Sequence, residues 1–211
     1  MTFASLVNPY DPVRVLTDDH IESIHRSSLR VLAETGLRVL DAGARARLAA
    51  AGCRVDDDIV RFDPDLIDAA VATAPRAFTL RARNPAHDLT IGGCNVVFGS
   101  VGGPAFVHDI ERGRRAGTLA ELVEFVRVIQ ILGVVHHEGG GPFEAMDLPA
   151  ETRHLDLLGA LARLVDKNWQ GIALGRERAA DSIDIAAIAL GTDRDGLAAD
   201  PAVLAIVNTN S

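Results

Sequence analysis

The segment Asn168-Trp169-Gln170-Gly171-Ile172-Ala173-Leu174, followed by a helix-length run from Arg176 to Leu190, decides the fold. Short, nearly continuous apolar segments are typical of parallel strands that are buried on both faces. The same alternation repeats on either side: helices are predicted over 119–132 and 149–166, and strands over 133–137 and 203–207. We therefore predict an α/β fold. A doubly wound sheet and a (β/α)₈ barrel begin alike, but the regular loop lengths favour the front part of a (β/α)₈ TIM barrel.

The alternation of strands and helices reaches Val207 and the polar residues Asn208-Thr209-Asn210-Ser211 after only a few repeats. Parallel strands need both faces covered, and a barrel needs closure. An unfinished set leaves an exposed edge. We therefore expect the chain to be the N-terminal fragment of a longer enzyme.

The residues before the repeat are mainly helical. Helices are predicted from Thr17, Asp41 and Asp63, since Thr17 and Asp63-Pro64 are typical N-cap patterns and Gly36 is a typical terminator. Ile21, Ile24, Leu29 and Leu32 form an approximate apolar stripe, and a hairpin is predicted over 53–62. We expect a helical N-terminal lead-in over 1–83. Region 84–211 would hold short β runs, a turn over 110–115 and the first strands and helices of an incomplete barrel.

Composition excludes several classes of function. The 211-residue chain has a formal net charge of −8, so it lacks the basic surface that binds nucleic acid or anionic membranes. No apolar run approaches the roughly 20 residues that span a bilayer, and the N-terminus lacks a signal-peptide pattern. We expect a cytoplasmic protein with no nucleic-acid or membrane partner.

Metal binding is not expected. Cys53 and Cys94 have no zinc-ligand spacing, and we expect buried or half-buried thiols. His136-His137-Glu138 lacks the His-Glu-x-x-His pattern, because Gly141 stands at the closing position. Adjacent residues of a strand point to opposite faces, so at most one of these histidines faces a site.

The polar residues that follow the predicted strands are the candidate ligand contacts. Gly139-Gly140-Gly141 matches neither a dinucleotide fingerprint nor a P-loop, and we interpret it as a flexible loop at a barrel mouth. Glu138 and Glu144 follow the same strand, and Asn208 and Asn210 follow the last one; all four are predicted to bind substrate. The alternatives are solvated loop charge and an ordinary turn. Asp147, in the same loop, is also a candidate helix cap, and Trp169 is interpreted as packing.

The order of these features resembles the trimethylamine methyltransferase family of corrinoid-dependent enzymes. The resemblance is carried by Leu16-Thr17-x-x-His20-Ile21-x-x-Ile24-His25, Val31-Leu32-x-x-Thr35-Gly36, Phe98-Gly99-x-x-Gly102-Gly103-Pro104-Ala105, Asp109-x-x-x-Gly113-Arg114-Arg115, Thr118, Asp147-x-Pro149, Asp166-Lys167 and Asn208-Thr209-Asn210-Ser211. It implies a barrel of roughly twice this length.

The resemblance also implies the chemistry. Members move a methyl group from a tertiary or quaternary amine, such as trimethylamine or a betaine, to the cobalt of a corrinoid held by a small partner protein, with no cofactor bound covalently. The cofactor then performs the difficult step, and no Ser/His/Asp or Cys/His set is required or found. Catalytic residues are left unassigned. The alternative is a noncatalytic half-barrel that binds a corrinoid protein or forms a homo-oligomer; a third interpretation is a barrel enzyme with a phosphate-bearing substrate, which the missing phosphate loops disfavour.

Overall fold

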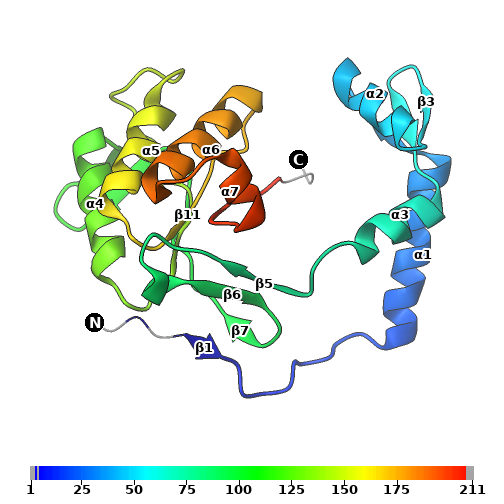
Figure 1. Cartoon of the computed structure of the whole chain (residues 1–211), viewed down its shortest axis with the longest axis horizontal. Coiled ribbons are helices and arrows are strands. Elements are labelled where there is room, and N and C mark those ends of the chain that lie inside the picture. The colour runs from blue at the N-terminus through cyan, green and yellow to red at the C-terminus, as the bar shows by residue number, and fades with distance from the viewer. Residues whose placement is uncertain (1–2, 4, 208–211) are drawn as a thin grey trace. The chain divides into compact units, whose positions relative to one another are not determined.

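The structure, a computed structural model, describes residue 3 and residues 5–207. It divides into two compact units (Figure 1): Met1–Pro9 with Ala77–Ser211, and Tyr10–Arg76. This boundary lies before the predicted division after residue 83, because Ala77–Leu80 forms a strand of the larger unit.

A parallel sheet organises the larger unit. Its strands are β10 (His137–Glu138), β11 (Asn168–Gln170) and β12 (Val203–Leu204), which pair in chain order with Glu138 beside Trp169 and Trp169 beside Val203. A further parallel bridge joins Gly99 to His137. The Ser100 N–H donates to the His137 carbonyl over 3.0 Å, so the segment before the hairpins extends the same ladder. Four chain segments thus follow one another across the sheet in sequence order.

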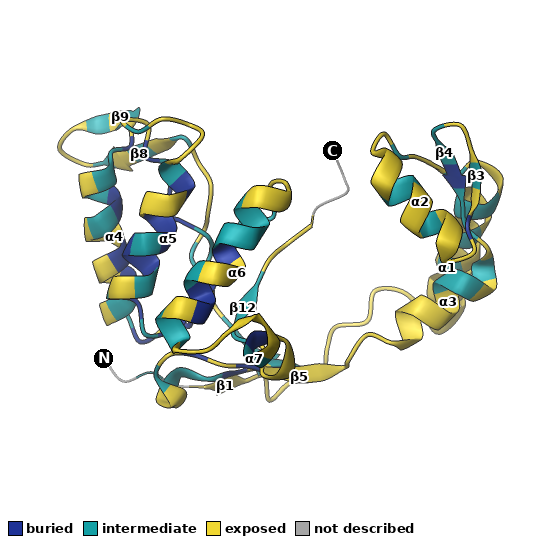
Figure 2. Cartoon of the chain, turned by 45° about the horizontal axis from the view of Figure 1, so that its top comes forward, coloured by how far each residue is buried: buried dark blue, intermediate teal, exposed yellow. Residues whose placement is uncertain are grey.

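Helices pack against one face of this sheet. They are α4 (Leu119–Ile131), α5 (Arg153–Leu164), α6 (Arg176–Leu190) and the short α7 (Arg194–Ala199). Their buried sides, dark blue in Figure 2, enclose the core. Trp169 is 7% exposed within that core, which confirms its predicted packing role.

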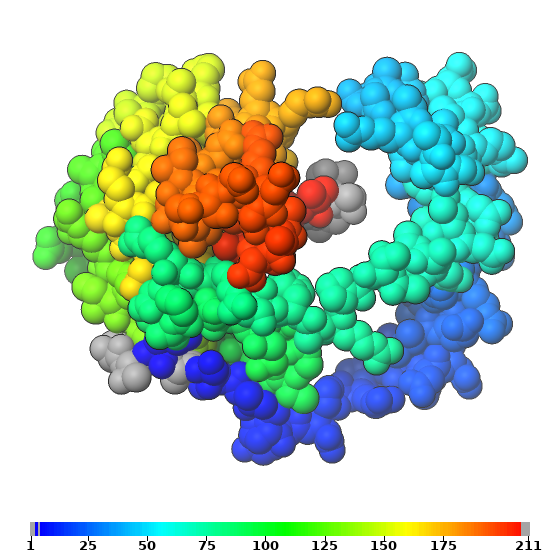
Figure 3. Space-filling model, viewed as in Figure 1, coloured from blue at the N-terminus to red at the C-terminus, as the bar shows by residue number. Residues whose placement is uncertain are grey.

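Antiparallel pairs complete the larger unit. Strand β5 (Ala77–Leu80) pairs with β6 (Leu89–Gly92) across a 3₁₀ turn, η1 (Pro85–His87). The other two pairs are β1 (Leu6–Val7) with β7 (Asn95–Val96) and β8 (Phe106–Asp109) with β9 (Gly113–Ala116). The Arg81 N–H donates to the Pro201 carbonyl over 2.8 Å, and Figure 3 shows α7 in red resting on the green atoms of β5 and β6. The β5–β6 hairpin therefore lies beside the chain that enters β12.

The smaller unit holds α1 (Asp18–Glu34), α2 (Ala42–Ala50) and α3 (Pro64–Ala72) around an antiparallel sheet in the order β2 (Leu37–Arg38), β4 (Ile59–Arg61), β3 (Arg54–Asp56). The predicted caps are confirmed: Thr17 accepts from the His20 N–H, Asp63 accepts from the Asp65 N–H, and Gly36 has φ 78°. Only Cys53 and Val60 are buried within this fully described unit, so its core is minimal.

The predicted α/β class is confirmed: the described residues show a mixed α/β unit, with a three-stranded parallel sheet and no closed barrel. Several other predictions need correction. Helix α7 was not predicted, and α5 begins at Arg153 because the Thr152 and Arg153 N–H groups donate to Pro149 in a turn. Gly113–Ala116 forms strand β9 and is not part of a turn. Its two arginines do not give the alternation of apolar and polar residues from which a strand is predicted. Cys94 is exposed, although Cys53 is buried as expected. Within the described residues, no helix is long and apolar enough to cross a membrane.

Candidate functional site

The carboxyl ends of the parallel strands form one edge, and glycines dominate it. Gly102 and Gly103 follow the first segment of the ladder, and Gly139, Gly140 and Gly141 follow β10; we call these five residues the glycine edge. The Gly103 N–H donates to the Gly141 carbonyl over 3.1 Å, and the Gly139 N–H donates to Ser100 Oγ over 2.9 Å. These bonds join the two loops. In α/β folds with parallel sheets, ligands bind at this edge.

Close backbone approach explains the glycines. A Cβ on Gly102 would lie 2.1 Å from the Gly139 carbonyl oxygen, and a Cβ on Gly139 would lie 2.0 Å from the Ser100 carbonyl oxygen. Gly140 and Gly141 have φ of 91° and 97°, in the region that favours glycine. Side chains are therefore excluded where the two loops meet.

Glu138 holds the loop after β10 in place. Its side chain is fully buried; Oε2 accepts from the Gly140 N–H over 2.9 Å and Oε1 accepts from the Gly141 N–H over 2.8 Å. Ser100 Oγ lies 3.5 Å from Oε1. Burial raises the pKa of Glu138, and the two backbone donors oppose that rise. The Glu138 side chain thus anchors the first part of this loop to the end of β10.

The two histidines before Glu138 have different surroundings. His136 Nδ1 accepts from the Phe98 N–H over 3.0 Å, and its ring stacks on Phe98. His137 is 8% exposed and neither ring nitrogen has a hydrogen-bond partner among the described residues. Burial lowers the pKa of His137 to about 4, so the ring is neutral near pH 7. Its cross-strand neighbour Asn168 also has an unpartnered Oδ1 there, while the Asn168 amide donates to the Arg81 carbonyl.

Strand alternation places these polar groups on one face. Trp169 points into the core under the helices, so Asn168 and Gln170 point to the opposite face. His137 pairs with Asn168 in register and shares that face. Gln170 ends β11, and a Cβ on Gly140 would lie 3.4 Å from its Nε2. Gln170 was not predicted, because the predicted strand continues to Leu174 and the sequence does not mark residue 170 as the strand end that the structure shows.

The structure does not bring the other predicted substrate contacts together with Glu138. The Glu144 carboxylate is 43% exposed and lies 3.6 Å from Arg153. Asp147 Oδ1 accepts from the Leu119 N–H over 2.9 Å, so it caps α4, a helix that precedes it in the chain. Asn208 and Asn210 lie outside the described residues.

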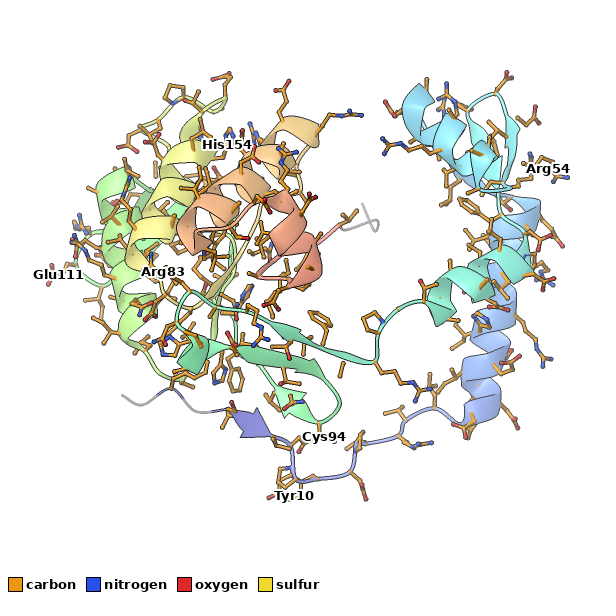
Figure 4. The ribbon with its side chains drawn as sticks, viewed as in Figure 1. Tyr10, Arg54, Arg83, Cys94, Glu111 and His154 are labelled. Atoms are coloured by element: carbon orange, nitrogen blue, oxygen red, sulfur yellow. The ribbon has the colours of Figure 1, made fainter. Side chains whose placement is uncertain are left out.

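A cleft of about 390 Å³ lies away from the glycine edge, between the β8–β9 hairpin and α4. Its charged groups pair with one another: Arg115 bridges Asp109 and Glu121, and the Arg112 N–H groups, with Arg115, hold the pKa of Asp109 at about 2. Figure 4 shows Glu111 at the outer tip of this hairpin and His154 at the start of α5, where its Nε2 lies 2.8 Å from Asp181 of α6. These pairs fix neighbouring elements to one another. The described residues contain no cluster of three or more metal-ligating side chains.

Comparison with known proteins identifies the family. The model of the trimethylamine methyltransferase family matches residues 1–211. A glycine betaine methyltransferase of Desulfitobacterium hafniense (strain Y51) is 32% identical over 195 residues, which cover 92% of this chain and 40% of that protein.

Two further relatives match over shorter stretches. A trimethylamine methyltransferase of Desulfitobacterium hafniense (strain DSM 10664 / DCB-2) is 30% identical over 53% of this chain and 23% of its own length. A proline betaine:corrinoid methyltransferase of Eubacterium limosum is 28% identical over 61% and 26%. The chain thus spans less than half the length of these relatives. It belongs to the trimethylamine methyltransferase family.

Proposed function

We propose that the protein containing this chain transfers a methyl group from a tertiary or quaternary amine to the cobalt of a corrinoid carried by a partner protein. The observation that carries the proposal is the family match over residues 1–211. The names of two relatives specify betaines, and one specifies a corrinoid acceptor. The corrinoid supplies cobalt as the nucleophile that accepts the methyl group.

The sheet supports a barrel framework for this chemistry. Four parallel segments follow chain order, with helices between β10, β11 and β12. We propose that they are the first strands of a (β/α)₈ barrel in which this chain is the N-terminal part. The glycine edge would then lie at the barrel mouth, where the substrate binds.

The residues at this edge fit a cofactor brought by another protein. Gly103 has no atom within 4 Å of an added Cβ, and the loops at this edge carry little side-chain bulk. A large planar group held by a partner can therefore approach the backbone closely. The role left to this chain is positioning: holding the N-methyl carbon in line with the acceptor and excluding water.

We propose distinct roles for the predicted contacts. Glu144, whose backbone N–H donates to the carbonyl of Pro104 next to Gly103, has a half-exposed carboxylate and provides negative charge toward a cationic amine. Asn208 and Asn210 hydrogen-bond the substrate's polar end. Glu138 contributes mainly by positioning, since its oxygens already accept from Gly140 and Gly141.

Product formation tests the proposal. The protein containing this chain would be incubated separately with glycine betaine, proline betaine and trimethylamine, with a reduced corrinoid protein. We expect the singly demethylated amine to appear together with the absorbance change of a methylated cobalt. Binding of the corrinoid protein without turnover of any amine would favour the noncatalytic alternative. If the protein showed no binding of the corrinoid protein and no turnover, both proposed functions would be excluded.

A further inference from the structure

Helix α1 carries apolar side chains that its own unit leaves uncovered. The predicted stripe divides in the structure: Leu29 and Leu32 are half-buried, whereas Ile21 and Ile24 are 54% and 55% exposed. Val31, seven residues after Ile24 and on the same side of the helix, is 53% exposed. One side of α1, with Leu29 and Leu32, packs within the unit toward α3 and β4. Ile21 lies on that same side yet stays exposed, whereas Ile24 and Val31 lie together on another side and present their side chains to solvent.

Charges flank this exposed stripe in a directional order. Asp19 and Glu22 lie in the first half of α1, and Arg26 and Arg30 lie in the second. Glu22 and Arg26 pair at 2.7 Å but stay 53% and 75% exposed. Arg30 forms no ion pair within the part of the chain that the structure describes. The flank is therefore acidic toward the N-terminus and basic toward the C-terminus.

The surface between the charges and the apolar stripe is indented. A depression of about 440 Å³ is lined by both acidic and basic residues of the flank together with Ser23 and Ser27. A neighbouring depression of about 540 Å³ is lined by the same two serines with Ile24 and Val31. Short serine side chains allow a second helix to approach closely at this position.

We propose that this face of α1 is a self-association surface, on which α1 of a second copy of the chain packs antiparallel. A two-fold axis near the middle of the helix would place Ile24 against Ser27 of the second copy and Val31 against its His20. Arg30 would then face the second copy's Asp19, and the same contact would repeat across the axis. Parallel packing would instead set Arg30 beside Arg30 and Asp19 beside Asp19.

The order of charges on this face of α1 is complementary to itself when two helices pack antiparallel, which favours a second copy of the chain as the occupant. The net charge of −8 makes two chains repel at long range, so the local order of charges must select any pairing. One helix pair buries less surface than a standard stable interface. The dimer is therefore expected to form reversibly with concentration.

The test is to reverse charges on α1 and then to restore the complementary pair. Dimerisation would be measured by sedimentation velocity of the 211-residue chain over a concentration series, with a reductant to protect the exposed Cys94. Arg30→Glu should weaken dimerisation about tenfold, since it replaces two attractive contacts by repulsive ones. The double variant Asp19→Arg/Arg30→Glu should restore it. Ile24→Glu should give a monomer, whereas Arg54→Glu, an exposed reversal outside α1, should leave the dimer unchanged.

Circular dichroism would confirm that each variant keeps its helices. A wild-type chain that stays monomeric at every concentration would overturn the proposal. So would a dimer that Ile24→Glu and Arg30→Glu leave intact, which would locate the interface elsewhere. Failure of the double variant to regain the dimer would exclude the antiparallel arrangement, because parallel packing predicts no rescue.

Discussion

Glu138 places a carboxylate in the protein interior and gives it two backbone donors. Glu138→Ala would leave the N–H groups of Gly140 and Gly141 without an acceptor and should lower the free energy of unfolding by about 2 to 4 kcal/mol. Glu138→Gln keeps the shape and one acceptor, and should cost about half as much. Urea unfolding at pH 7 measures both. Equal, negligible losses would show that the loop does not depend on this carboxylate.

His137 makes the free energy of unfolding depend on pH. Its pKa is lowered from 6.5 to about 4 in the folded chain, so the unfolded chain binds more protons between these values. The stability contributed by the neutral ring is therefore fully present above about pH 6.5 and decreases as the pH falls toward 4, by up to about 3 kcal/mol.

His137→Phe removes the titrating group and keeps a ring of similar size. We expect the difference in unfolding free energy between wild type and His137→Phe to change with pH over that window and to be constant above it. Urea titrations at several pH values provide the comparison. A pH-independent difference would mean that His137 titrates alike in both states.

At the level of single residues, sequence patterns predicted local roles better than spatial ones. Thr17 and Asp63 cap helices as predicted, since a cap depends on neighbours a few residues away. Asp147 was also considered a cap, but the helix it caps begins 28 residues earlier. No local pattern reveals such a partner. The bonds from the Gly140 and Gly141 N–H groups to Glu138 are local in sequence, but they form outside a helix, and the N-cap patterns therefore do not reveal them.

At the level of elements, the parallel ladder depends on glycine where its loops cross. Gly139→Ala would place a Cβ 2.0 Å from the Ser100 carbonyl oxygen, and backbone must move to relieve the contact. We expect a loss of about 3 kcal/mol in unfolding free energy. Gly99→Ala is the matched control, because its Cβ would meet only ordinary contacts at 3.5 Å, and it should cost under about 1 kcal/mol. Equal losses of unfolding free energy for Gly139→Ala and Gly99→Ala would mean that the two loops do not approach closely at Gly139.

Lys167 joins the end of α4 to the start of β11. Its ammonium group, 2% exposed by residue, donates to the carbonyls of Ile129, Leu132 and Val135 over 2.8 to 2.9 Å. Lys167→Met keeps the length of the side chain and leaves three carbonyls without this donor. We expect a loss of about 3 kcal/mol, since hydrogen bonds to charged groups are the stronger ones. Thermal unfolding would measure it, with exposed Arg127→Met as control.

The elements themselves were predicted unevenly. Helix α6 matches its predicted bounds because its pattern is long and ends at Gly191, which has φ 66°. Strand β12 is shorter than predicted, since only part of its apolar run finds a hydrogen-bonding neighbour. Strand β10 begins at the last residue of the predicted strand 133–137 and includes Glu138, so its paired residues are polar and not the apolar run. Strand β9 was missed because Arg114 and Arg115 are stabilised by Phe106 and Asp109, contacts that only the folded hairpin brings together.

At the level of the whole molecule, the two units differ in buried apolar surface. The larger unit encloses a cluster that includes Leu158, Leu161 and Val165, each at most 1% exposed. The smaller unit, Tyr10–Arg76, buries only Cys53 and Val60. Because burial of apolar surface is the main source of stability, we expect the smaller unit to open first.

Hydrogen exchange followed by mass spectrometry tests this order of opening. Amides of α1 and α3 should exchange with opening free energies at least about 2 kcal/mol below those of α5 and β11. The Ile24→Glu variant, studied alongside wild type, separates the intrinsic weakness of the unit from protection by self-association: wild type should gain protection in α1 as concentration rises, and the variant should not. A common opening free energy for both units would mean that the chain unfolds as one cooperative body, and that the sparse core of Tyr10–Arg76 is stabilised in a way its buried residues do not reveal.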